Sequence, residues 1–221
     1  MNEHAQPKAH LFEQMARVAK AMGNGKRLEL LDLLAQSERT VHGLAQTAGL
    51  GITTASAQLQ NLKQGGLVAT RREGTRVYYR LAGDDVADLY ARMRDVAGAH
   101  LADVAVAAEA FLGVDTEQVT RDELLRSAKE GDITVLDVRP QEEYDAGHIP
   151  NAVSIPLDQL ADRLAELPDD VEVVAYCRGA YCVLAPLAVR LLTGVGRRAR
   201  RLDIGMLEWR LAGLPVQERA A

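Results

Sequence analysis

The sequence predicts two domains of different classes: an α+β domain over residues 1–114 and an α/β domain, with a parallel sheet flanked by helices, over residues 115–221. Three observations support this division. Apolar residues recur mostly at helical spacing up to about residue 112, whereas short apolar runs alternate with helical segments beyond it. Residues 1–114 hold 13 Lys and Arg against 12 Asp and Glu, and residues 115–221 hold 13 against 19, so the acidity belongs to the second domain.

The overall composition bounds the class of protein. The 221 residues are 48% hydrophobic and 26% charged, which allows two cores and excludes wholesale disorder. No stretch approaches the ~20 apolar residues of a membrane span, and the start MNEHAQPKAH lacks the layout of a secretory signal. Two cysteines are too few for a disulfide scaffold. We therefore expect a cytoplasmic protein without membrane association.

The first domain is expected to be helical apart from one hairpin. Leucines crowd a helix near 28–34, and two further short helices, within 41–49 and 50–66, are joined by a turn that contains Gly49 and Gly51. The segment LVATRREGTRVYYRL then alternates in polarity around Glu73-Gly74-Thr75, which predicts a hairpin. Apolar residues at i, i+3, i+4 spacing predict one long helix over 84–112, whose apolar stripe calls for a partner helix, for example from a second copy.

Two short helices joined by a glycine-containing turn have the layout of a helix-turn-helix, whose second helix enters the DNA major groove. Hydroxyl and amide groups on that helix can bond phosphates or base edges, and basic side chains there and at the hairpin tip can contact the DNA backbone. The alternative is a small helical domain with a solvated polar face. The candidate DNA-binding residues are Thr53, Thr54, Ser56, Gln58, Gln60, Lys63, Arg71, Arg72 and Arg76.

Residues 10–112 resemble the ArsR/SmtB family of dimeric winged-helix repressors. ITTASAQLQNLKQGGLV corresponds to the family's recognition helix and RREGTRVYYRL to its wing. The resemblance implies a homodimer formed through the first and last helices. It also implies double-stranded DNA as the partner, read as an imperfect palindrome with half-sites ~34 Å apart.

Many members of that family sense metals, but this sequence lacks their ligands. Residues 39–44, where the family carries cysteines, read RTVHGL. His100 and Asp103 would supply half of the other familiar site, but Leu89 stands where its second cluster is required. We therefore expect no metal and no cofactor, and interpret His42 and His100 as surface or dimer-face residues.

The second domain should place its chemistry at the end of one strand. Strands are predicted at 133–138, 152–157 and 171–176, with helices at 120–130, 158–166 and 183–193. The third strand leads directly into a six-residue loop and an apolar helix. Chemistry collects at such strand ends, and backbone N–H groups with the helix dipole favour an anion there. This predicts a nucleophilic Cys177 of lowered pKa in an anion cradle, with a buried structural cysteine as the alternative; the cradle is Arg178, Gly179, Ala180, Tyr181 and Cys182.

Residues 117–217 resemble a rhodanese domain. The segments LDVRP (136–140), EY (143–144) and GHIPNA (147–152) correspond to its first signature, and GMLEW (205–209) with GLPV (213–216) to its closing one. The resemblance implies that Cys177 takes a sulfane sulfur from a small donor such as thiosulfate or a polysulfide, and passes it to a thiol acceptor or cyanide. Asp137 and Arg139 correspond to structural residues.

The loop departs from the common pattern, which has Gly fourth and Arg sixth. Here Gly179 is third and Cys182 is sixth, so the fixed cation is missing unless Arg178 replaces it. Cys182 could attack a persulfide on Cys177 to give a disulfide or a sulfur-bridged link; alternatively it is a small apolar residue at a helix start. The basic run at 197–201 is interpreted as a solvated edge.

Three functions remain open at this stage. The first is a repressor whose rhodanese domain senses sulfane sulfur or redox state through Cys177. The second is an active sulfurtransferase, from thiosulfate or polysulfide to a thiol, that the DNA-binding domain localises or regulates. The third is a repressor whose second domain only stabilises the dimer.

Overall fold

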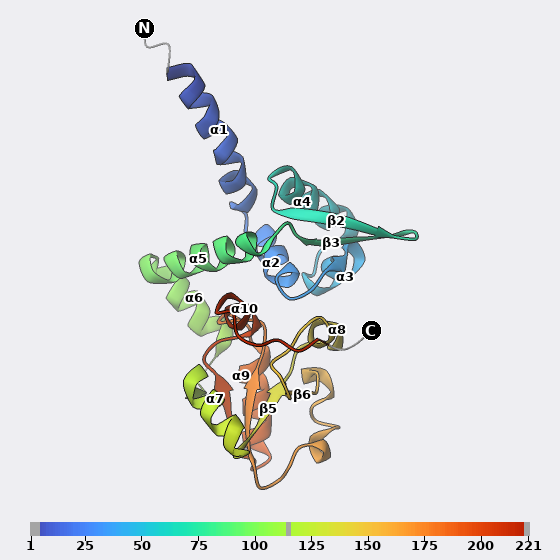
Figure 1. Cartoon of the computed structure of the whole chain (residues 1–221), viewed down its shortest axis with the longest axis vertical. Helices are drawn as coiled ribbons and strands as arrows, with labels where there is room; N and C mark the ends of the chain where they lie inside the picture. The colour runs from blue at the N-terminus through green and yellow to red at the C-terminus, as the bar shows by residue number, and fades with distance from the viewer. Residues whose placement is uncertain (1–4, 114–115, 219–221) are drawn as a thin grey trace. The chain divides into compact units, whose positions relative to one another are not determined.

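The computed structural model describes residues 5–113 and 116–218, which form two compact units that divide after Arg92 (Figure 1). We call them the first unit and the second unit. The sequence placed the domain boundary after residue 114, and Val114 and Asp115 of that junction lie outside the described residues. The division after Arg92 lies inside a helix, α5 (Asp84–His100), so its last residues pack with the second unit. No described helix is long and apolar enough to span a membrane.

The first unit has the helix-turn-helix and hairpin that the sequence predicted. Its other helices are α1 (Ala5–Met22), α2 (Gly25–Leu34), α3 (Val41–Thr47) and α4 (Ile52–Gln64). The strands are β1 (Arg39–Thr40), β2 (Val68–Glu73) and β3 (Arg76–Leu81), paired antiparallel in the order β1-β3-β2. Fully buried leucines of α2, α3 and α4 form the core. In Figure 1, α1 extends away from the rest of this unit.

Local chemistry fixes where the helix-turn-helix begins and turns. The Thr40 hydroxyl accepts a hydrogen bond from Gly43 N at 3.2 Å and so caps the start of α3. The chain leaves α3 through Gly49, whose φ of 61° lies in the left-handed region that glycine adopts without strain. Leu50 N then bonds to Ala45 O at 2.8 Å, which closes the turn before α4. The orientation of the recognition helix therefore depends on a few local interactions.

The second unit is a five-stranded parallel sheet with helices on both faces, which confirms the predicted class. The sheet order is β4 (Gln118–Val119), β8 (Ala199–Leu202), β7 (Glu172–Tyr176), β5 (Ile133–Asp137) and β6 (Val153–Ser154). Helix α9 (Leu184–Gly194) packs on one face, and α7 (Arg121–Glu130) and α10 (Met206–Leu211) pack on the other. Helices α6 (Ala102–Leu112) and α8 (Gln141–Asp145) complete the unit.

Three predicted elements were wrong in extent. The single helix over 84–112 is two helices, because Leu101 adopts an extended backbone (φ −114°, ψ 104°) between α5 and α6. The strand over 152–157 is Val153–Ser154 alone, because Ile155 N and Leu157 N donate to the consecutive carbonyls of Asp137 and Val138, which breaks the regular ladder. The helix over 158–166 is two 3₁₀ turns, Leu157–Gln159 and Leu164–Glu166, because Arg163 leaves helical geometry with ψ at 17°.

Candidate functional site

The cysteine loop runs from the end of β7 to the start of α9 and is held by the first residues of α10. Met206 N donates to Cys177 O at 2.9 Å, and Leu207 N donates to Arg178 O at 3.0 Å. Gly205 makes this close approach feasible, because a Cβ at that position would overlap the backbone of Gly179. The loop and the start of α10 are therefore packed backbone to backbone.

The two cysteines of the loop are free thiols that contact one another. Cys177 is only 4% exposed, whereas Cys182 is half-buried. The Cys177 thiol lies 3.4 Å from Cys182 O and donates to it, and the N–H groups of Gly179 and Ala185 donate to the Cys177 sulfur. Since Ala185 is in the first turn of α9, the helix N-terminus faces the buried sulfur.

The structure reverses the expected ionisation of Cys177. Burial raises the pKa of the Cys177 thiol well above its usual range, and a hydrogen bond between the two thiol side chains, separate from the one to the Cys182 carbonyl, raises this pKa further. That same hydrogen bond lowers the pKa of Cys182, with help from the N–H groups of Leu184 and Arg178. The predicted thiolate therefore forms first on Cys182, because desolvation at Cys177 outweighs the N–H groups that surround it.

Arg178 binds a buried carboxylate on α8. Its Nε lies 3.0 Å from both oxygens of Glu143, and its Nη2 lies 2.6 Å from Oε1. Glu143 is fully buried, so this bidentate pair neutralises it. The positive charge of Arg178 also helps to lower the pKa of Cys182. Glu143 thus fixes the direction of the Arg178 side chain. Arg178 is therefore not free to take the place of the arginine that is missing from the sixth loop position.

The remaining loop residues differ in their surroundings. Ala180 is half-buried, and Tyr181 is exposed with its ring 5.8 Å from the guanidinium carbon of Arg94. A Cβ on Gly179 would lie 3.2 Å from Arg94 Nη1 and 3.2 Å from Glu208 Oε1. Sequence analysis missed Arg94 and Glu208 as neighbours of the loop. Glu208 stands inside the quoted closing signature, but Arg94 carries no local signal.

A buried network beneath the loop supports the strand ends. Arg139 Nη2 pairs with Asp137 Oδ2 at 2.6 Å and also donates to Gly147 O at 2.9 Å. The Tyr176 hydroxyl donates to Asp137 Oδ2 at 2.5 Å. All three side chains of this network are completely buried. Its components have partners and no route to solvent, which is the arrangement of structural groups rather than of reacting ones.

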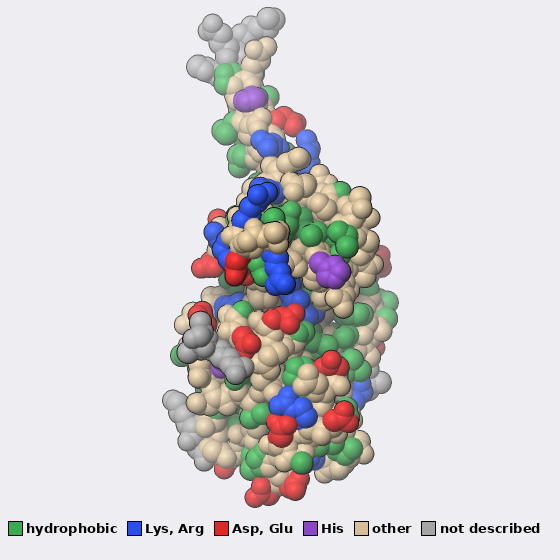
Figure 2. All heavy atoms as spheres, turned by 90° about the vertical axis from the view of Figure 1, so that its right-hand side faces the viewer, with side chains coloured by type: hydrophobic (Ala, Val, Ile, Leu, Met, Phe, Trp, Pro, Cys, Tyr) green, Lys and Arg blue, Asp and Glu red, His purple; other side chains and the backbone are tan. Residues whose placement is uncertain are grey.

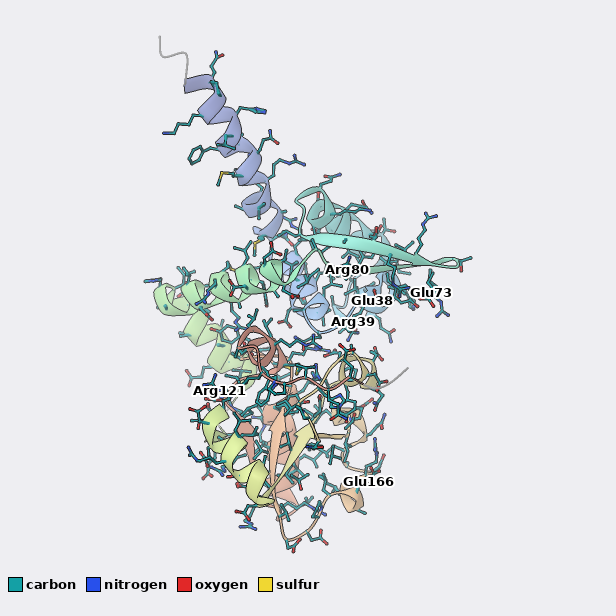
Figure 3. The ribbon with its side chains drawn as sticks, in the orientation of Figure 1. Glu38, Arg39, Glu73, Arg80, Arg121 and Glu166 are labelled. Atoms are coloured by element: carbon teal, nitrogen blue, oxygen red, sulfur yellow. The ribbon has the colours of Figure 1, made fainter. Side chains whose placement is uncertain are left out.

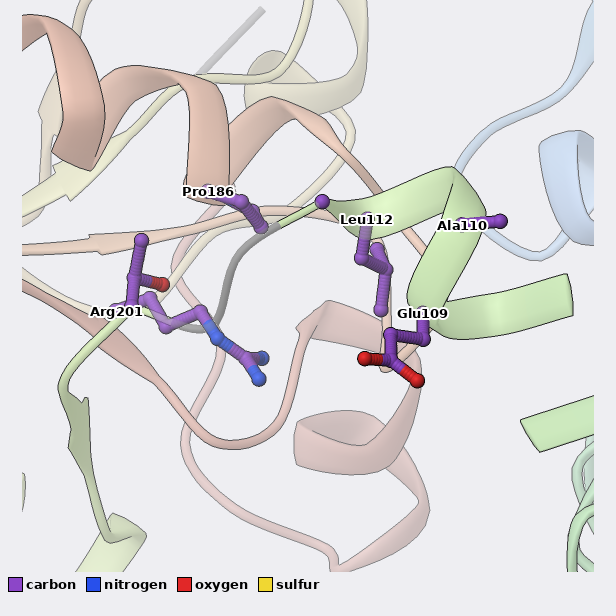
Figure 4. A pocket seen from close by; sticks show the side chains of 7 residues that line it. Glu109, Ala110, Leu112, Pro186 and Arg201 are labelled. Atoms are coloured by element: carbon purple, nitrogen blue, oxygen red, sulfur yellow. The ribbon is translucent and has the colours of Figure 1, made fainter. Parts of the chain in front are cut away.

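A groove of about 670 Å³ lies elsewhere in the second unit (Figure 4). In Figure 4, Glu109 and Arg201 extend toward the groove from opposite sides, and Leu112 and Pro186 supply apolar walls. Neither cysteine lines it. This groove is therefore separate from the thiol chemistry.

Some candidate recognition residues are simply exposed, and others form hydrogen bonds within the first unit. Thr53 and Thr54 are exposed on the first turn of α4, and Ser56 is half-buried. Gln58 Oε1 accepts from Arg27 Nη1 at 3.0 Å, and Gln60 Nε2 donates to the Tyr79 hydroxyl at 3.1 Å. Lys63 Nζ is exposed and donates to the Thr70 hydroxyl at 3.0 Å. The exposed face of α4 also carries polar residues that sequence analysis did not select, Asn61 and Gln64.

The hairpin arginines are exposed but not equivalent. Lys and Arg side chains gather on the hairpin side of the first unit (Figure 2). Arg71 pairs with Glu38 at 2.5 Å and with Glu73 at 2.7 Å; both carboxylates lie along the hairpin (Figure 3). These pairs raise the pKa of Arg71. Among the described residues, the side chains of Arg72 and Arg76 form no hydrogen bond or ion pair, so these two arginines are more available to a phosphate than Arg71.

The basic run at 197–201 is engaged within the second unit. Arg197 donates to Leu167 O at 2.9 Å and pairs with Asp169 at 2.5 Å. Arg200 pairs with Glu172 at 2.6 Å and with Glu123 at 2.9 Å. These contacts leave little charge for a second nucleic-acid surface. Within residues 5–113 and 116–218, no three His, Cys, Asp or Glu side chains are grouped to hold a metal ion.

Comparison with known proteins places both halves of the chain. The family model "Bacterial regulatory protein, arsR family" matches residues 24–70, and the "Rhodanese-like domain" model matches residues 120–212. The HTH-type transcriptional regulator Rv0324 of Mycobacterium tuberculosis is 62% identical over 213 residues, which cover 96% of this chain and 94% of that protein. A sulfurtransferase of Allochromatium vinosum is 31% identical over 103 residues, 47% of this chain and 92% of that protein.

A solved structure resembles the first half. It is the homodimeric winged helix-turn-helix DNA-binding domain, fragment 1–100, of Mb0332 from Mycobacterium bovis. The two sequences are 57% identical, the match covers 46% of this chain and 94% of that one, and the TM-score is 0.43.

Proposed function

The chain belongs to the ArsR-family helix-turn-helix transcriptional regulators and carries a rhodanese domain after its DNA-binding domain. From this premise we propose that it is a cytoplasmic, homodimeric repressor whose rhodanese domain senses sulfane sulfur or redox state through Cys177. The observation that carries the proposal is the closed loop in which Cys177 is buried and hydrogen-bonded to Cys182. A rapid sulfurtransferase needs a thiolate that donors reach in every cycle. A thiol that reacts only after its loop has rearranged is better suited to switching the protein once between two states.

The chemistry of the change needs only the two thiols and a donor. The Cys177 thiol loses its proton, and its thiolate attacks the outer sulfur of a persulfide RSSH; a Cys177 persulfide forms, and the leaving RS⁻ takes up a proton as RSH. The Cys182 thiolate then attacks the inner sulfur of that persulfide, which forms a Cys177–Cys182 disulfide and releases HS⁻. The lowered pKa of Cys182 makes it the suitable resolving thiolate. Because the interior around Cys177 is filled, either product obliges the loop to rearrange.

The DNA-binding half of the proposal depends on α4 and the hairpin. Thr53 and Thr54 are exposed on the first turn of α4 and would contact base edges, and the exposed Arg72 and Arg76 would contact phosphates. A homodimer through α1 and α5 is supported by large apolar residues that the chain leaves exposed on those helices, namely Leu11, Phe12 and Met15 on α1 and Leu89 and Val96 on α5. Two copies would then read an imperfect palindrome.

A second candidate function is sulfur transfer by the same cysteine. The similarity to the Allochromatium vinosum sulfurtransferase over 47% of the chain favours it, as do the N–H groups aimed at the Cys177 sulfur. A thiosulfate or polysulfide donor would then load Cys177, and a thiol acceptor would unload it repeatedly. The two candidates differ in turnover and in the response of DNA binding.

The deciding experiment measures DNA affinity and sulfur transfer in the same protein. DNA from upstream of the protein's own gene is titrated with wild type, Cys177→Ser and Cys182→Ser, each before and after treatment with a polysulfide. We expect wild-type affinity to change about 100-fold, which corresponds to about 2.7 kcal/mol, and Cys177→Ser not to respond. An unchanged wild-type affinity would reject the sensor. Many turnovers per protein with thiosulfate or polysulfide would favour the enzyme.

A further inference from the structure

Helix α5 places one arginine against the cysteine loop. Arg94 is 9% exposed and forms an ion pair with Glu208, on α10, within the second unit. The other oxygen of that carboxylate, Oε2, accepts a hydrogen bond from Gly205 N at 2.8 Å and so caps α10. A single carboxylate therefore holds both the start of α10 and the Arg94 side chain of α5.

The same part of α5 contacts the loop at two of its residues. Arg94 Nη1 would lie 3.2 Å from a Cβ on Gly179, and its guanidinium carbon is 5.8 Å from the Tyr181 ring. One helical turn later, a Cβ on Gly98 would lie 2.8 Å from the Tyr181 hydroxyl oxygen. Glycine at 98 therefore leaves room for the Tyr181 side chain. The loop residues between the two cysteines rest on α5 as well as on α10.

We propose that Arg94 and Glu208 are positioning residues that couple the state of the Cys177–Cys182 loop to helix α5. The proposal deepens the sensor function and rests on it. The carbonyl oxygens of Cys177 and Arg178 are bonded to the first N–H groups of α10, so a rearranged loop displaces Gly205 and the Glu208 carboxylate with it. The Arg94 side chain must then move with the Glu208 carboxylate, or the ion pair between them breaks.

The burial of the Arg94–Glu208 ion pair makes it costly to break. Removing one member of a mostly buried ion pair is strongly unfavourable, because the remaining charge is less well compensated and is not fully hydrated. Asp95 lies 3.8 Å from Arg94 Nη2 but is exposed and on the same helix, so it does not tie α5 to the loop. The ion pair therefore either stays closed, with α5 following the loop, or opens completely. Both outcomes change α5.

The other end of the same helix belongs to the first unit. Within that unit, Val86, Tyr90 and Ala91 are buried, and the Tyr90 hydroxyl donates to Asp32 Oδ1 on α2 at 3.2 Å. Tyr90 and Arg94 are four residues apart on the unbroken helix Asp84–His100, and neighbours at this spacing lie on one face. A tilt or rotation of α5 at Arg94 is therefore felt at Tyr90 one turn away. The helix is a physical route from the thiols to the DNA-binding unit.

The test compares Arg94→Gln with a matched variant on the same helix, Arg92→Gln. Arg92 forms an exposed ion pair with Asp88 at 3.4 Å, on the part of α5 that belongs to the first unit. Each protein is brought to its fully reduced and its fully disulfide form, verified by mass, and DNA affinity is measured in both. We expect wild type and Arg92→Gln to change about 100-fold between the forms, and Arg94→Gln and Glu208→Gln to change less than about five-fold. An undiminished response in Arg94→Gln would overturn the proposal.

A second readout does not depend on DNA. Hydrogen exchange of the peptide covering 84–100 is followed before and after disulfide formation. We expect altered protection of this peptide in wild type and Arg92→Gln, a lost response in Arg94→Gln, and partial recovery in Arg94→Lys, which keeps the charge. If wild-type α5 does not respond to disulfide formation, the coupling is rejected even where DNA affinity changes. If α5 responds and DNA affinity does not, the sensor function fails and the coupling stands.

Discussion

Arg178 of the cysteine loop donates hydrogen bonds to both carboxylate oxygens of Glu143, and the Glu143 side chain has no solvent exposure. The pair joins the loop to α8, a helix of five residues that is also held by the hydrogen bond from the Tyr144 hydroxyl to Ala152 O at 2.8 Å. It also positions a permanent positive charge near Cys182.

Glu143→Ala should destabilise the second unit. Removing one member of a buried pair leaves Arg178 uncompensated, at a cost of about 3 kcal/mol in the free energy of unfolding. Urea denaturation measures this cost. The control is Glu166→Gln, which breaks the exposed ion pair with Arg163 and should leave the midpoint unchanged. A Glu143→Ala protein as stable as wild type would mean that the pair does not fix the loop.

The two cysteines should react in a fixed order that depends on pH. The pKa of Cys182 is lowered and that of Cys177 is raised, so iodoacetamide near pH 8 should label Cys182 first. Cys177 should react appreciably only as the pH rises above the ordinary thiol range. Peptide mass spectrometry after timed quenching separates the two sites.

Arg178→Gln supplies the matched variant for this titration. Loss of its charge should raise the pKa of Cys182 and move the alkylation profile of that residue to higher pH, with little effect on the profile of Cys177. Labelling of Cys177 ahead of Cys182 at pH 8 would show that the buried thiol, and not the half-buried one, carries the thiolate.

The hairpin arginines should differ in their contribution to DNA affinity. Arg72→Ala and Arg76→Ala should each weaken binding across sequences and reduce the salt slope by about 1, as expected for a lost phosphate contact. Glu38→Gln should strengthen binding, because it releases one of the two carboxylates that hold Arg71. Fluorescence anisotropy over a salt series measures both effects.

Arg121→Ala is the control for the hairpin variants, since Arg121 is an exposed arginine of the second unit that pairs with Asp122 at 3.1 Å. It should change neither the affinity nor the salt slope. A salt slope unaltered by both Arg72→Ala and Arg76→Ala would remove the hairpin from the DNA interface.

The structural elements that the sequence predicts correctly are those determined by residues close together in the chain. The hairpin follows from alternation around Gly74, and the turn before α4 follows from Gly49, each within a few residues. The cysteine loop follows from a strand, six residues and a helix in succession. Resemblance to two families then supplied the classes of both domains.

The parts it did not reach depend on residues distant in the chain. The pKa of Cys177 is set by burial, and that burial requires Gly205 to admit α10 against the loop. Arg178 faces Glu143 across 35 residues, and Arg94 meets Glu208 across 114. No local pattern encodes such pairs. The break at Leu101 was hidden for a different reason, since the apolar stripe continues through it.

The apolar face of α1 should be a subunit interface. Phe12 and Met15 are 57% and 61% exposed and lie on the same helix as Leu11, and this helix extends away from the rest of the first unit (Figure 1). Burying such side chains against a second copy removes apolar surface worth about 1.5–3 kcal/mol for each residue. Met15→Glu should therefore shift the protein from dimer toward monomer in light scattering at micromolar concentration, and should weaken DNA binding because the two half-sites are no longer held together. Val195→Glu places the same charge on a residue that is 55% exposed but belongs to the second unit, and should leave the molar mass unchanged. If the Met15→Glu protein stays fully dimeric, α1 is not part of the interface and other exposed apolar faces must form the dimer. The next face to test is that of α6, on which Val106 and Phe111 are exposed.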